Sequence, residues 1–409
     1  MFNMANKSLG AAKKSKNDEF YTQYGDIQKE IEAYLEYDPD TFRGKVVYSN
    51  CDDPFESNFF RYFALNFNRL GLKRLITTSY KPSPIANTQL GLFGDDKTIA
   101  PDKGRPKVTA NKLIINEVGD MDGDGAFNLT DIAEQLKANN NNEWAPLEGD
   151  GDFRSLECIE LLKQSDIIVT NPPFSLFREF IRQIFDYKKK LIVIGNLNAI
   201  TYKEIFPLIK EDKLWLGNGF HAGNAFFSTP NARNDFASGV YDQKSGLVKF
   251  RNCHWFTNLD HGRRHQKLSL MTTEDNLKFN KKMQGKTSYD RYDNYDAIEV
   301  PFTNAIPSDY YGVMGVPISF LDRYSPEQFE IVGLTSGRDE FECIPSKRYI
   351  NAEQHNVNGT IVNGSKANTR ATILMKDKPV DIYYTADNAD SPFLIVYARI
   401  LIKHRKVVS

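Results

Sequence analysis

Residues 166–174 read DIIVTNPPF, a stretch that ends in Asn171, Pro172, Pro173 and Phe174. The four residues before the asparagine are β-formers, which is typical of a strand buried in a sheet. Two consecutive prolines fix φ and remove two backbone donors, so the chain leaves the strand in one stiff conformation. We therefore predict that this strand ends at the carboxyl edge of a parallel sheet, where α/β folds bind ligands.

Strand and helix patterns alternate on the N-terminal side of this stretch and continue beyond it. A helix is expected over residues 25–37, a strand over 44–50, a second helix that ends at a cap on Gly71, and a strand over 73–80. This order predicts parallel strands joined by a right-handed crossover. Because the alternation lasts to about residue 218, we predict a doubly wound, Rossmann-like α/β domain.

The remaining residues, 219–409, contain short apolar pieces such as HWFTNL, separated by turns and charged loops. They predict an α+β or largely β second region. The whole chain has 409 residues and a formal net charge of −1, which excludes a histone-like polycation but permits a locally basic face. Its four cysteines lie far apart, so we expect neither a disulfide framework nor a zinc site, and we expect a cytoplasmic setting. No apolar run is long enough for a membrane helix, so no membrane partner is expected.

The NPPF sequence suits chemistry on a planar amine. The exocyclic amine of a base is a poor nucleophile because its lone pair is delocalised into the ring. The side-chain oxygen of Asn171 and the carbonyl of Pro172 can accept its hydrogens and favour the tetrahedral nitrogen of the transition state. Phe174 would stack on the base. The alternative is a simple strand-ending turn in which the asparagine bonds the local backbone.

NPPF after such a strand resembles the catalytic motif of amino-methyltransferases that use S-adenosylmethionine. The stretches DEFYTQYGDIQKEI, GKVVYSNCDDPFESNFFRYF, GLKRLITTSYK, EGDGDFRS and HWFTNLDHGRRH resemble the EcoRI-type adenine-specific DNA methyltransferase family. The resemblance covers roughly residues 17–340. It implies a class I methyltransferase sheet and methyl transfer to N6 of an adenine that swings out of duplex DNA.

The resemblance also implies a cofactor site near the N-terminus. The FYT segment, with Tyr21 and Thr22, would close over the cofactor. The loop after the first strand contains Asn50, Asp52 and Asp53 but no glycine, unlike the general GxG pattern. Either aspartate can hold the amino group of the cofactor by a charge-assisted hydrogen bond. The alternative is that Asp53 caps the helix that follows.

A second candidate cofactor loop is GDGDF, residues 149–153. Its likeness to GDF-type motifs implies that Asp152 accepts from the adenine amino group of the cofactor and that Phe153 packs on the ring. The alternative is a tight turn in which the aspartate caps the next helix.

Residues 120–131 match an EF-hand calcium loop except at the final position. Glycine occupies the sixth position, and aspartate stands where the loop normally ends in glutamate. The candidate ligands are Asp120, Asp122, Asp124, Asn128 and Asp131. We predict a structural calcium ion, and the alternative is a surface turn followed by a capped helix.

Residues 249–291 hold ten lysines and arginines against four acids. Such a segment suits contact with phosphates, although charge runs are often solvated faces. Within it, Arg263, Arg264 and Lys267 are the candidate contacts to DNA.

These observations predict a flexible basic arm over residues 1–18, a catalytic domain that binds S-adenosylmethionine over 19–220 with an insertion at 81–145, and a target-recognition region over 221–409. The expected partners are double-stranded DNA and a cognate restriction endonuclease, and the expected state is a monomer. Two alternatives are a methyltransferase that acts on an amide or amine of RNA or protein, and a non-catalytic nucleic-acid-binding module on the same scaffold.

Overall fold

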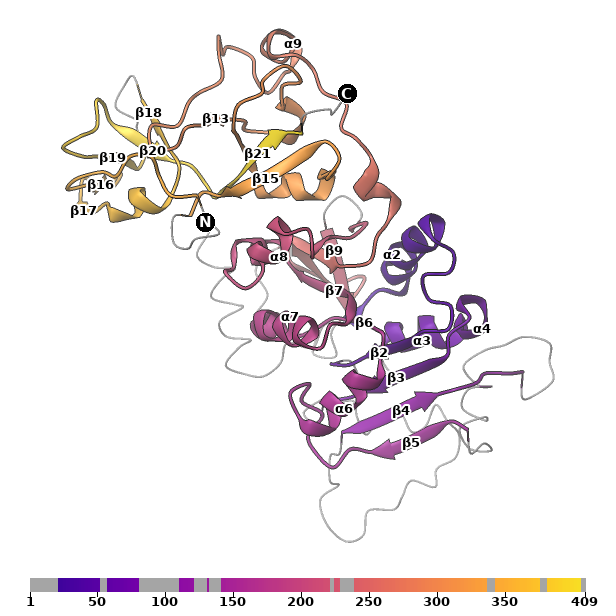
Figure 1. The fold of residues 1–409 in the computed structure, drawn as a ribbon. Coiled ribbons are helices and arrows are strands. Elements are labelled where there is room, and N and C mark those ends of the chain that lie inside the picture. Colours follow the sequence, from indigo (N-terminus) through magenta and orange to yellow (C-terminus); the bar gives the residue numbers. More distant parts are fainter. Residues whose placement is uncertain are drawn as a thin grey trace. The chain divides into compact units, whose positions relative to one another are not determined.

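The computed structural model describes nine stretches of the chain, counting one isolated residue. They are residues 21–51, 57–80, 110–120, 131, 141–220, 224–228, 239–336, 343–375 and 381–405, with Asp131 as the isolated position. Contacts divide the chain into two compact units (Figure 1). Unit 1 contains residues 1–196 and 216–262, and unit 2 contains residues 197–215 and 263–409.

Unit 1 is built on an eight-stranded mixed sheet with the order β5-β4-β3-β2-β6-β7-β12-β8. Its strands are β2 (Val46–Ser49), β3 (Arg74–Thr78), β4 (Asn111–Ile115), β5 (Glu143–Pro146), β6 (Ile167–Thr170), β7 (Lys190–Asn196), β12 (Cys253–Thr257) and β8 (Trp215–Leu216). Its helices are α2 (Tyr24–Tyr37), α3 (Asn58–Leu65), α4 (Phe67–Leu70), α6 (Leu156–Gln164) and α7 (Phe177–Asp186). The four central strands, β3, β2, β6 and β7, are parallel. The predictions of a mixed α/β fold and of a parallel β2–β3 pair are confirmed.

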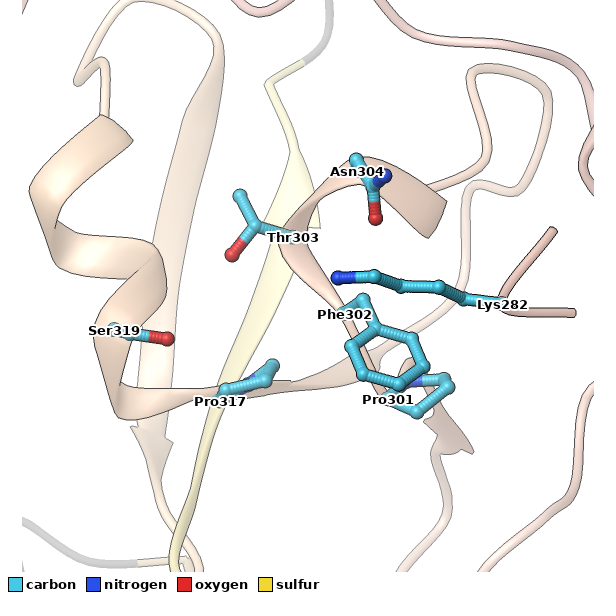
Figure 2. Close-up of a pocket in the computed structure, with 7 residues that line it drawn as sticks. All are labelled: Lys282, Pro301, Phe302, Thr303, Asn304, Pro317 and Ser319. Carbon is cyan, nitrogen blue, oxygen red and sulfur yellow. The ribbon is translucent and has the colours of Figure 1, made fainter. Parts of the chain in front are cut away.

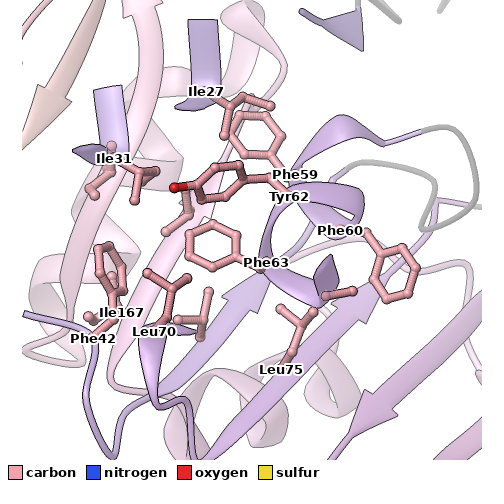
Figure 3. Packing of buried hydrophobic residues seen from close by; sticks show 14 of the residues in the cluster. Ile27, Ile31, Phe42, Phe59, Phe60, Tyr62, Phe63, Leu70, Leu75 and Ile167 are labelled. Atoms are coloured by element: carbon pink, nitrogen blue, oxygen red, sulfur yellow. The ribbon is translucent and has the colours of Figure 1, made fainter. Parts of the chain in front are cut away.

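Helices cover both faces of this sheet because its central strands are apolar on both sides. On one face, Ile27 and Ile31 of α2 and Phe59 and Phe63 of α3 belong to one buried cluster with Leu75 of β3 (Figure 3). On the other face, α6 packs on β2 and α7 on β7. Phe177 of α7 meets Phe256 of β12 with ring centroids 5.1 Å apart. Burial of this kind contributes about 25 cal/mol per Å² of apolar surface.

The helix expected to run up to Gly71 is interrupted. It forms α3 and the short α4, which meet at Asn66. The Asn66 side chain donates to the carbonyl of Tyr62, a local bond that competes with helix continuation. Gly71 ends α4 in the left-handed conformation, as predicted.

The HWFTNL segment joins the sheet of unit 1. Its strand β12 lies beside β7 and antiparallel to it, with Trp255 paired to Ile194. The sequence predicts a catalytic domain over residues 19–220 and a C-terminal region over 221–409, whereas contacts group residues 216–262 with unit 1 and residues 197–215 with unit 2. The physical reason is the open edge of β7, whose backbone donors and acceptors β12 satisfies.

A smaller sheet in unit 1 has the order β1-β9-β11-β10. Its strands are β1 (Tyr21–Thr22), β9 (Asn224–Ser228), β11 (Leu247–Arg251) and β10 (Tyr241–Asp242). Phe227 of β9 is fully buried and belongs to the same apolar cluster as α2 and α3. This sheet therefore shares the core of unit 1.

Unit 2 contains two sheets, with the orders β13-β14-β21-β15 and β17-β16-β19-β20-β18. The strands of the first are β13 (Ile298–Glu299), β14 (Met314–Pro317), β21 (Arg399–His404) and β15 (Phe329–Leu334). Those of the second are β17 (Ile361–Asn363), β16 (Glu353–His355), β19 (Tyr383–Thr385), β20 (Phe393–Ile395) and β18 (Thr372–Leu374). The α-helices of its described part are α8 (Phe206–Lys210) and α9 (Thr273–Phe279). Across the described ranges, no helix is both long and apolar enough to cross a membrane.

Candidate active site

The NPPF segment leaves the sheet at the carboxyl end of β6. Asn171 follows the last strand residue directly and is partly buried. The two prolines lead to Phe174, which begins a short 3-10 turn before α7 starts at Phe177. The sequence therefore places the four candidate catalytic residues in one stiff connection between a central strand and a covering helix.

This connection lies beside the end of the neighbouring strand β2. The two strands are parallel, with Val47 paired to Ile167, so their carboxyl ends share one edge of the sheet. The hydroxyl of Thr170 donates to the backbone carbonyl of Asn50. The structure thus brings the candidate catalytic segment and the start of the first candidate cofactor loop together.

The loop after β2 turns without glycine. Cys51 takes the left-handed conformation with φ of 69°, a region that residues with a Cβ adopt rarely. Cys51 therefore adopts a backbone conformation that glycine adopts more readily. Asp52 and Asp53 lie outside the described residues.

Several buried polar atoms near this edge have no hydrogen-bond partner among the described residues. They are the hydroxyl oxygens of Ser49 and Thr22 and the side-chain oxygen of Asn50. Leaving such an atom unsatisfied costs about 1–3 kcal/mol. A ligand that donates N–H or O–H groups would recover this free energy, so these residues fit a polar ligand.

The FYT segment reaches this region through the smaller sheet. Tyr21 and Thr22 form β1, which pairs antiparallel with β9, and both residues are buried. The backbone carbonyl of Thr22 accepts a 2.7 Å hydrogen bond from the side chain of Asn58, the first residue of α3. The pairing with β9 and this bond hold Thr22 at the N-terminal end of the helix that follows the β2 loop.

The GDGDF loop approaches the carboxyl end of β3. Gly151 has φ of 77°, and a Cβ there would lie 1.9 Å from the carbonyl oxygen of Ser79, so only glycine permits this approach. Partial burial, followed by the negative charges of Asp150 and Asp152, raises the pKa of Tyr80. Tyr80 and this loop therefore share one electrostatic environment beyond β3.

Within this loop, Asp152 is bound to Arg154. The carboxylate accepts from the Arg154 backbone at 2.9 Å and from its guanidinium at 2.6 Å, and the guanidinium hydrogen bond lowers the pKa of Asp152. Arg154 also reaches Glu179 of α7. The alternative that Asp152 caps the next helix is wrong, because Ser155 caps α6 by accepting from Cys158. Phe153 is buried, with its ring 5.1 Å from that of Phe180.

Sequence reasoning missed the aromatic partner of Phe174. The Phe174 ring meets Phe250 of β11 edge-on, with centroids 6.1 Å apart and an interplanar angle of 84°. Phe250 in turn contacts Phe227 at 5.4 Å. The alternating sequence LVKFR was the available signal for this strand. Ser49 and Tyr80 were also missed, although their positions at the ends of adjacent parallel strands indicate them.

The candidate DNA contacts lie in unit 2 and differ in exposure. Arg264 is buried, stacks 3.9 Å above the Trp215 ring and pairs with Asp212. Arg263 pairs with Asp322 at 2.5 Å. Lys267 is exposed. Of the three residues, Lys267 alone is exposed.

Most of the candidate calcium loop lies outside the described residues, including Asp122, Asp124 and Asn128. Of its ends, Asp120 is exposed and Asp131 is buried. Among described residues, no group of three or more His, Cys, Asp or Glu side chains is arranged to hold a metal ion. The calcium prediction therefore stays a prediction from sequence.

Comparison with known proteins identifies relatives over nearly the whole chain. A family described as "Adenine-specific methyltransferase EcoRI" matches residues 8–405. The type II methyltransferase M.EcoRI of Escherichia coli is 43% identical over 83% of this chain and 92% of its own length. The type II methyltransferase M.MpnI of Mycoplasma pneumoniae is 32% identical over 90% of this chain and 98% of its own length. M.MgeORF184P of Mycoplasma genitalium, also a type II methyltransferase, is 33% identical over 88% and 96%. No solved structure gives a significant match.

Proposed function

Because the chain belongs to the EcoRI family of adenine-specific methyltransferases, we propose that it transfers a methyl group from S-adenosylmethionine to N6 of an adenine extruded from duplex DNA. The observation that carries this proposal is the shared sheet edge. The NPPF segment and the polar end of β2 are joined there by the bond from Thr170 to Asn50. One edge can therefore hold a methyl donor and a base side by side.

The unsatisfied oxygens of Thr22, Ser49 and Asn50 support a cofactor site at this edge. They would accept hydrogens from the amino and hydroxyl groups of S-adenosylmethionine, with Tyr21 closing over it. Asp52 and Asp53 remain the proposed acceptors for its ammonium group. When bound, the cofactor supplies an electrophilic methyl group on a positively charged sulfur.

The GDGDF loop is the proposed binding site for the adenine ring of the cofactor. Arg154 fixes the orientation of the Asp152 carboxylate. A carboxylate has about four acceptor positions, so Asp152 can still accept from an exocyclic amine. Phe153 would form the apolar wall beneath the ring, and its burial on Phe180 supports a fixed position for it.

At the target base, the oxygens of Asn171 and Pro172 would accept the two hydrogens of the amine. This arrangement stabilises the tetrahedral nitrogen of the transition state more than the planar ground state. Pro173 would keep the connection stiff. Phe174 would stack on the base, and the nearly perpendicular ring of Phe250 in the small sheet supports the Phe174 ring.

We propose that the eight-stranded sheet is a Rossmann-like, doubly wound methyltransferase sheet whose ligand crevice lies between β2 and β6. The chain proceeds from β2 to β3 on one side and from β6 to β7 on the other, which is how a switch point arises. Residues 19–220, apart from residues 197–215 of unit 2, would form the catalytic domain together with β9 to β12. The part of the 221–409 region that belongs to unit 2 would recognise the target.

Target recognition would involve the part of the basic segment that belongs to unit 2, residues 263–291, which we call the basic segment of unit 2. Lys267 is exposed and is the most direct candidate for a phosphate contact among the three. To contact DNA, Arg263 would have to give up its ion pair with Asp322, and Arg264 its ion pair with Asp212. The type II designation of the relatives supports a role beside a cognate restriction endonuclease, and we expect the enzyme to act as a monomer.

The test is transfer of labelled methyl from S-adenosylmethionine to duplex DNA, followed by nucleoside analysis. N6-methyladenine is the expected product. N4-methylcytosine would overturn the assignment of the base. Label found in RNA or protein and not in DNA would overturn the assignment of the substrate.

A further inference from the structure

The basic segment of unit 2 contains two kinds of cation. Four pair with carboxylates, namely Arg263 with Asp322, Arg264 with Asp212, Lys286 with Asp290, and Arg291 with Asp296. In contrast, Lys278, Lys281 and Lys282 are exposed and have no carboxylate within salt-bridge distance among the described residues. Exposed cations of this kind can neutralise the phosphates of a polyanion, which releases the counterions condensed on that polyanion.

Two of these lysines lie over aromatic rings that are themselves exposed. The Lys282 ammonium is 4.4 Å from the centre of the Phe302 ring, and the Lys278 ammonium is 5.1 Å from that of Phe279. Phe302 is 37% exposed and Phe279 is 62% exposed. Exposed phenylalanines beside cations mark a surface that suits a ligand with both apolar and anionic parts.

Phe302 and Lys282 line an open pocket of about 400 Å³ (Figure 2). The lysine side chain extends over the ring towards Thr303 and Asn304, and the hydroxyls of Thr303 and Ser319 face the same space. The pocket therefore combines one positive charge, an aromatic face and three neutral polar side chains, with no carboxylate in its lining.

The walls of this pocket are held together by buried polar groups. The side chain of Asn280 donates to the carbonyl of Asn304 at 3.1 Å and accepts from the backbone of Lys282 at 3.1 Å. The Tyr289 hydroxyl donates to the carbonyl of Ala305 at 2.6 Å. These bonds fix the lysine backbone relative to the aromatic wall, so little ordering is needed on binding.

We propose that this pocket binds one phosphate and the adjoining deoxyribose of the DNA substrate. Lys282 would neutralise the phosphate, the hydroxyls of Thr303 and Ser319 and the amide of Asn304 would donate to its oxygens, and Phe302 would pack on the sugar. The size of the pocket and its single cation fit one backbone unit. The inference rests on the proposed function because it requires DNA as the substrate.

The test uses the full-length protein with Lys282→Gln and measures binding to duplex DNA at several salt concentrations. Loss of one phosphate contact should lower the slope of log affinity against log salt by about 0.9 and weaken binding roughly threefold to tenfold. The effect should be equal for target and unrelated duplexes, because a backbone contact carries no sequence information. Phe302→Ala should weaken binding without changing the slope.

Lys366→Gln is the matched control, because Lys366 is an exposed lysine of the same unit on the 3-10 turn at Ser365–Thr369. It should leave affinity and slope unchanged. If wild-type protein methylates DNA but Lys282→Gln binds it with the wild-type slope, the pocket assignment is wrong and the proposed function stands. If the variant loses affinity for the target duplex alone, the contact is to a base and the backbone assignment is wrong. If wild-type protein binds and methylates no DNA, the proposed function itself fails.

Discussion

At the scale of single residues, the edge between β2 and β6 combines one rigid acceptor with several unsatisfied ones. Asn171 is fixed by the strand before it and the prolines after it. Ser49 and Asn50 carry buried oxygens that have no partner among the described residues. Buried oxygens without a partner lower the stability of the fold. Proteins commonly tolerate such a cost at sites that bind a ligand.

Asn171→Ala should lower the turnover number for methyl transfer roughly a hundredfold or more, because it removes an acceptor that acts in the transition state. Affinity for S-adenosylmethionine should remain close to that of the wild type. Single-turnover methylation and calorimetric binding of the cofactor measure the two effects. Ser175→Ala, which changes an exposed hydroxyl of the same connection, is the control and should behave as wild type. Turnover near the wild-type value in Asn171→Ala would show that NPPF is not catalytic.

Ser49→Ala should separate ligand binding from stability. The lost hydroxyl has no partner among the described residues, so the melting temperature without cofactor should stay the same or rise. Affinity for S-adenosylmethionine should fall roughly fivefold to tenfold, as expected for one hydrogen bond of about 1 kcal/mol.

Ser165→Ala is the matched control, because the Ser165 hydroxyl is buried and donates to Leu162 at 2.7 Å. This control should lower the free energy of unfolding by about 1 kcal/mol and leave cofactor affinity unchanged. Wild-type cofactor affinity in Ser49→Ala would remove Ser49 from the site.

At the scale of elements, the sequence predicted the central strands well because each is a short apolar run bounded by turn residues. The predicted strands at residues 44–50 and 73–80 contain β2 and β3, and Gly71 ends the helical segment between them. The antiparallel strand β12 could not be placed, since nothing in HWFTNL specifies β7 as its partner. The contact between Phe174 and Phe250 could not be predicted either, because it joins the 3-10 turn after β6 to β11, and the two are far apart in sequence.

The loop at residues 149–153 should make stability depend on pH in a defined direction. Arg154 lowers the pKa of Asp152, so the pair stabilises the fold above the pKa of the unfolded chain, near 4, and this contribution is lost as the pH falls through the lower pKa of the folded state. Arg154→Gln should therefore be less stable than wild type at pH 7 by about 0.2–1 kcal/mol, as for a partly exposed pair. The difference should shrink below about pH 4.

Denaturant unfolding at a series of pH values measures this effect. Glu179→Gln removes the other carboxylate near Arg154 and leaves the pair with Asp152 in place. It should therefore keep the wild-type slope of stability against pH between about 2 and 4. If the free energies of unfolding of Arg154→Gln and wild type differ by a constant amount across this range, the pair between Asp152 and Arg154 does not cause the dependence of stability on pH.

At the scale of the whole molecule, residues 120–131 are predicted to bind one calcium ion that supports the fold. Without a cation, repulsion among the acidic side chains opposes the turn, whereas an ion that binds the folded state alone stabilises it by mass action. Chelator should lower the melting temperature of calcium-loaded protein, calcium should restore it, and magnesium should do so poorly. Methylation well below the melting temperature should survive chelation. Identical melting curves for loaded and chelated protein would reduce the segment to an ordinary turn.

The chain passes between the two units three times, near residues 196, 215 and 262. Neither unit is therefore encoded by one continuous part of the gene. During synthesis on the ribosome, the edge of β7 stays open until β12 has emerged, although the residues for all four parallel strands have been made by residue 196. A nascent chain with such an exposed edge is prone to pair with other chains. A fragment cut at residue 220 would retain that open edge permanently, whereas translation past residue 257 supplies the strand that closes it.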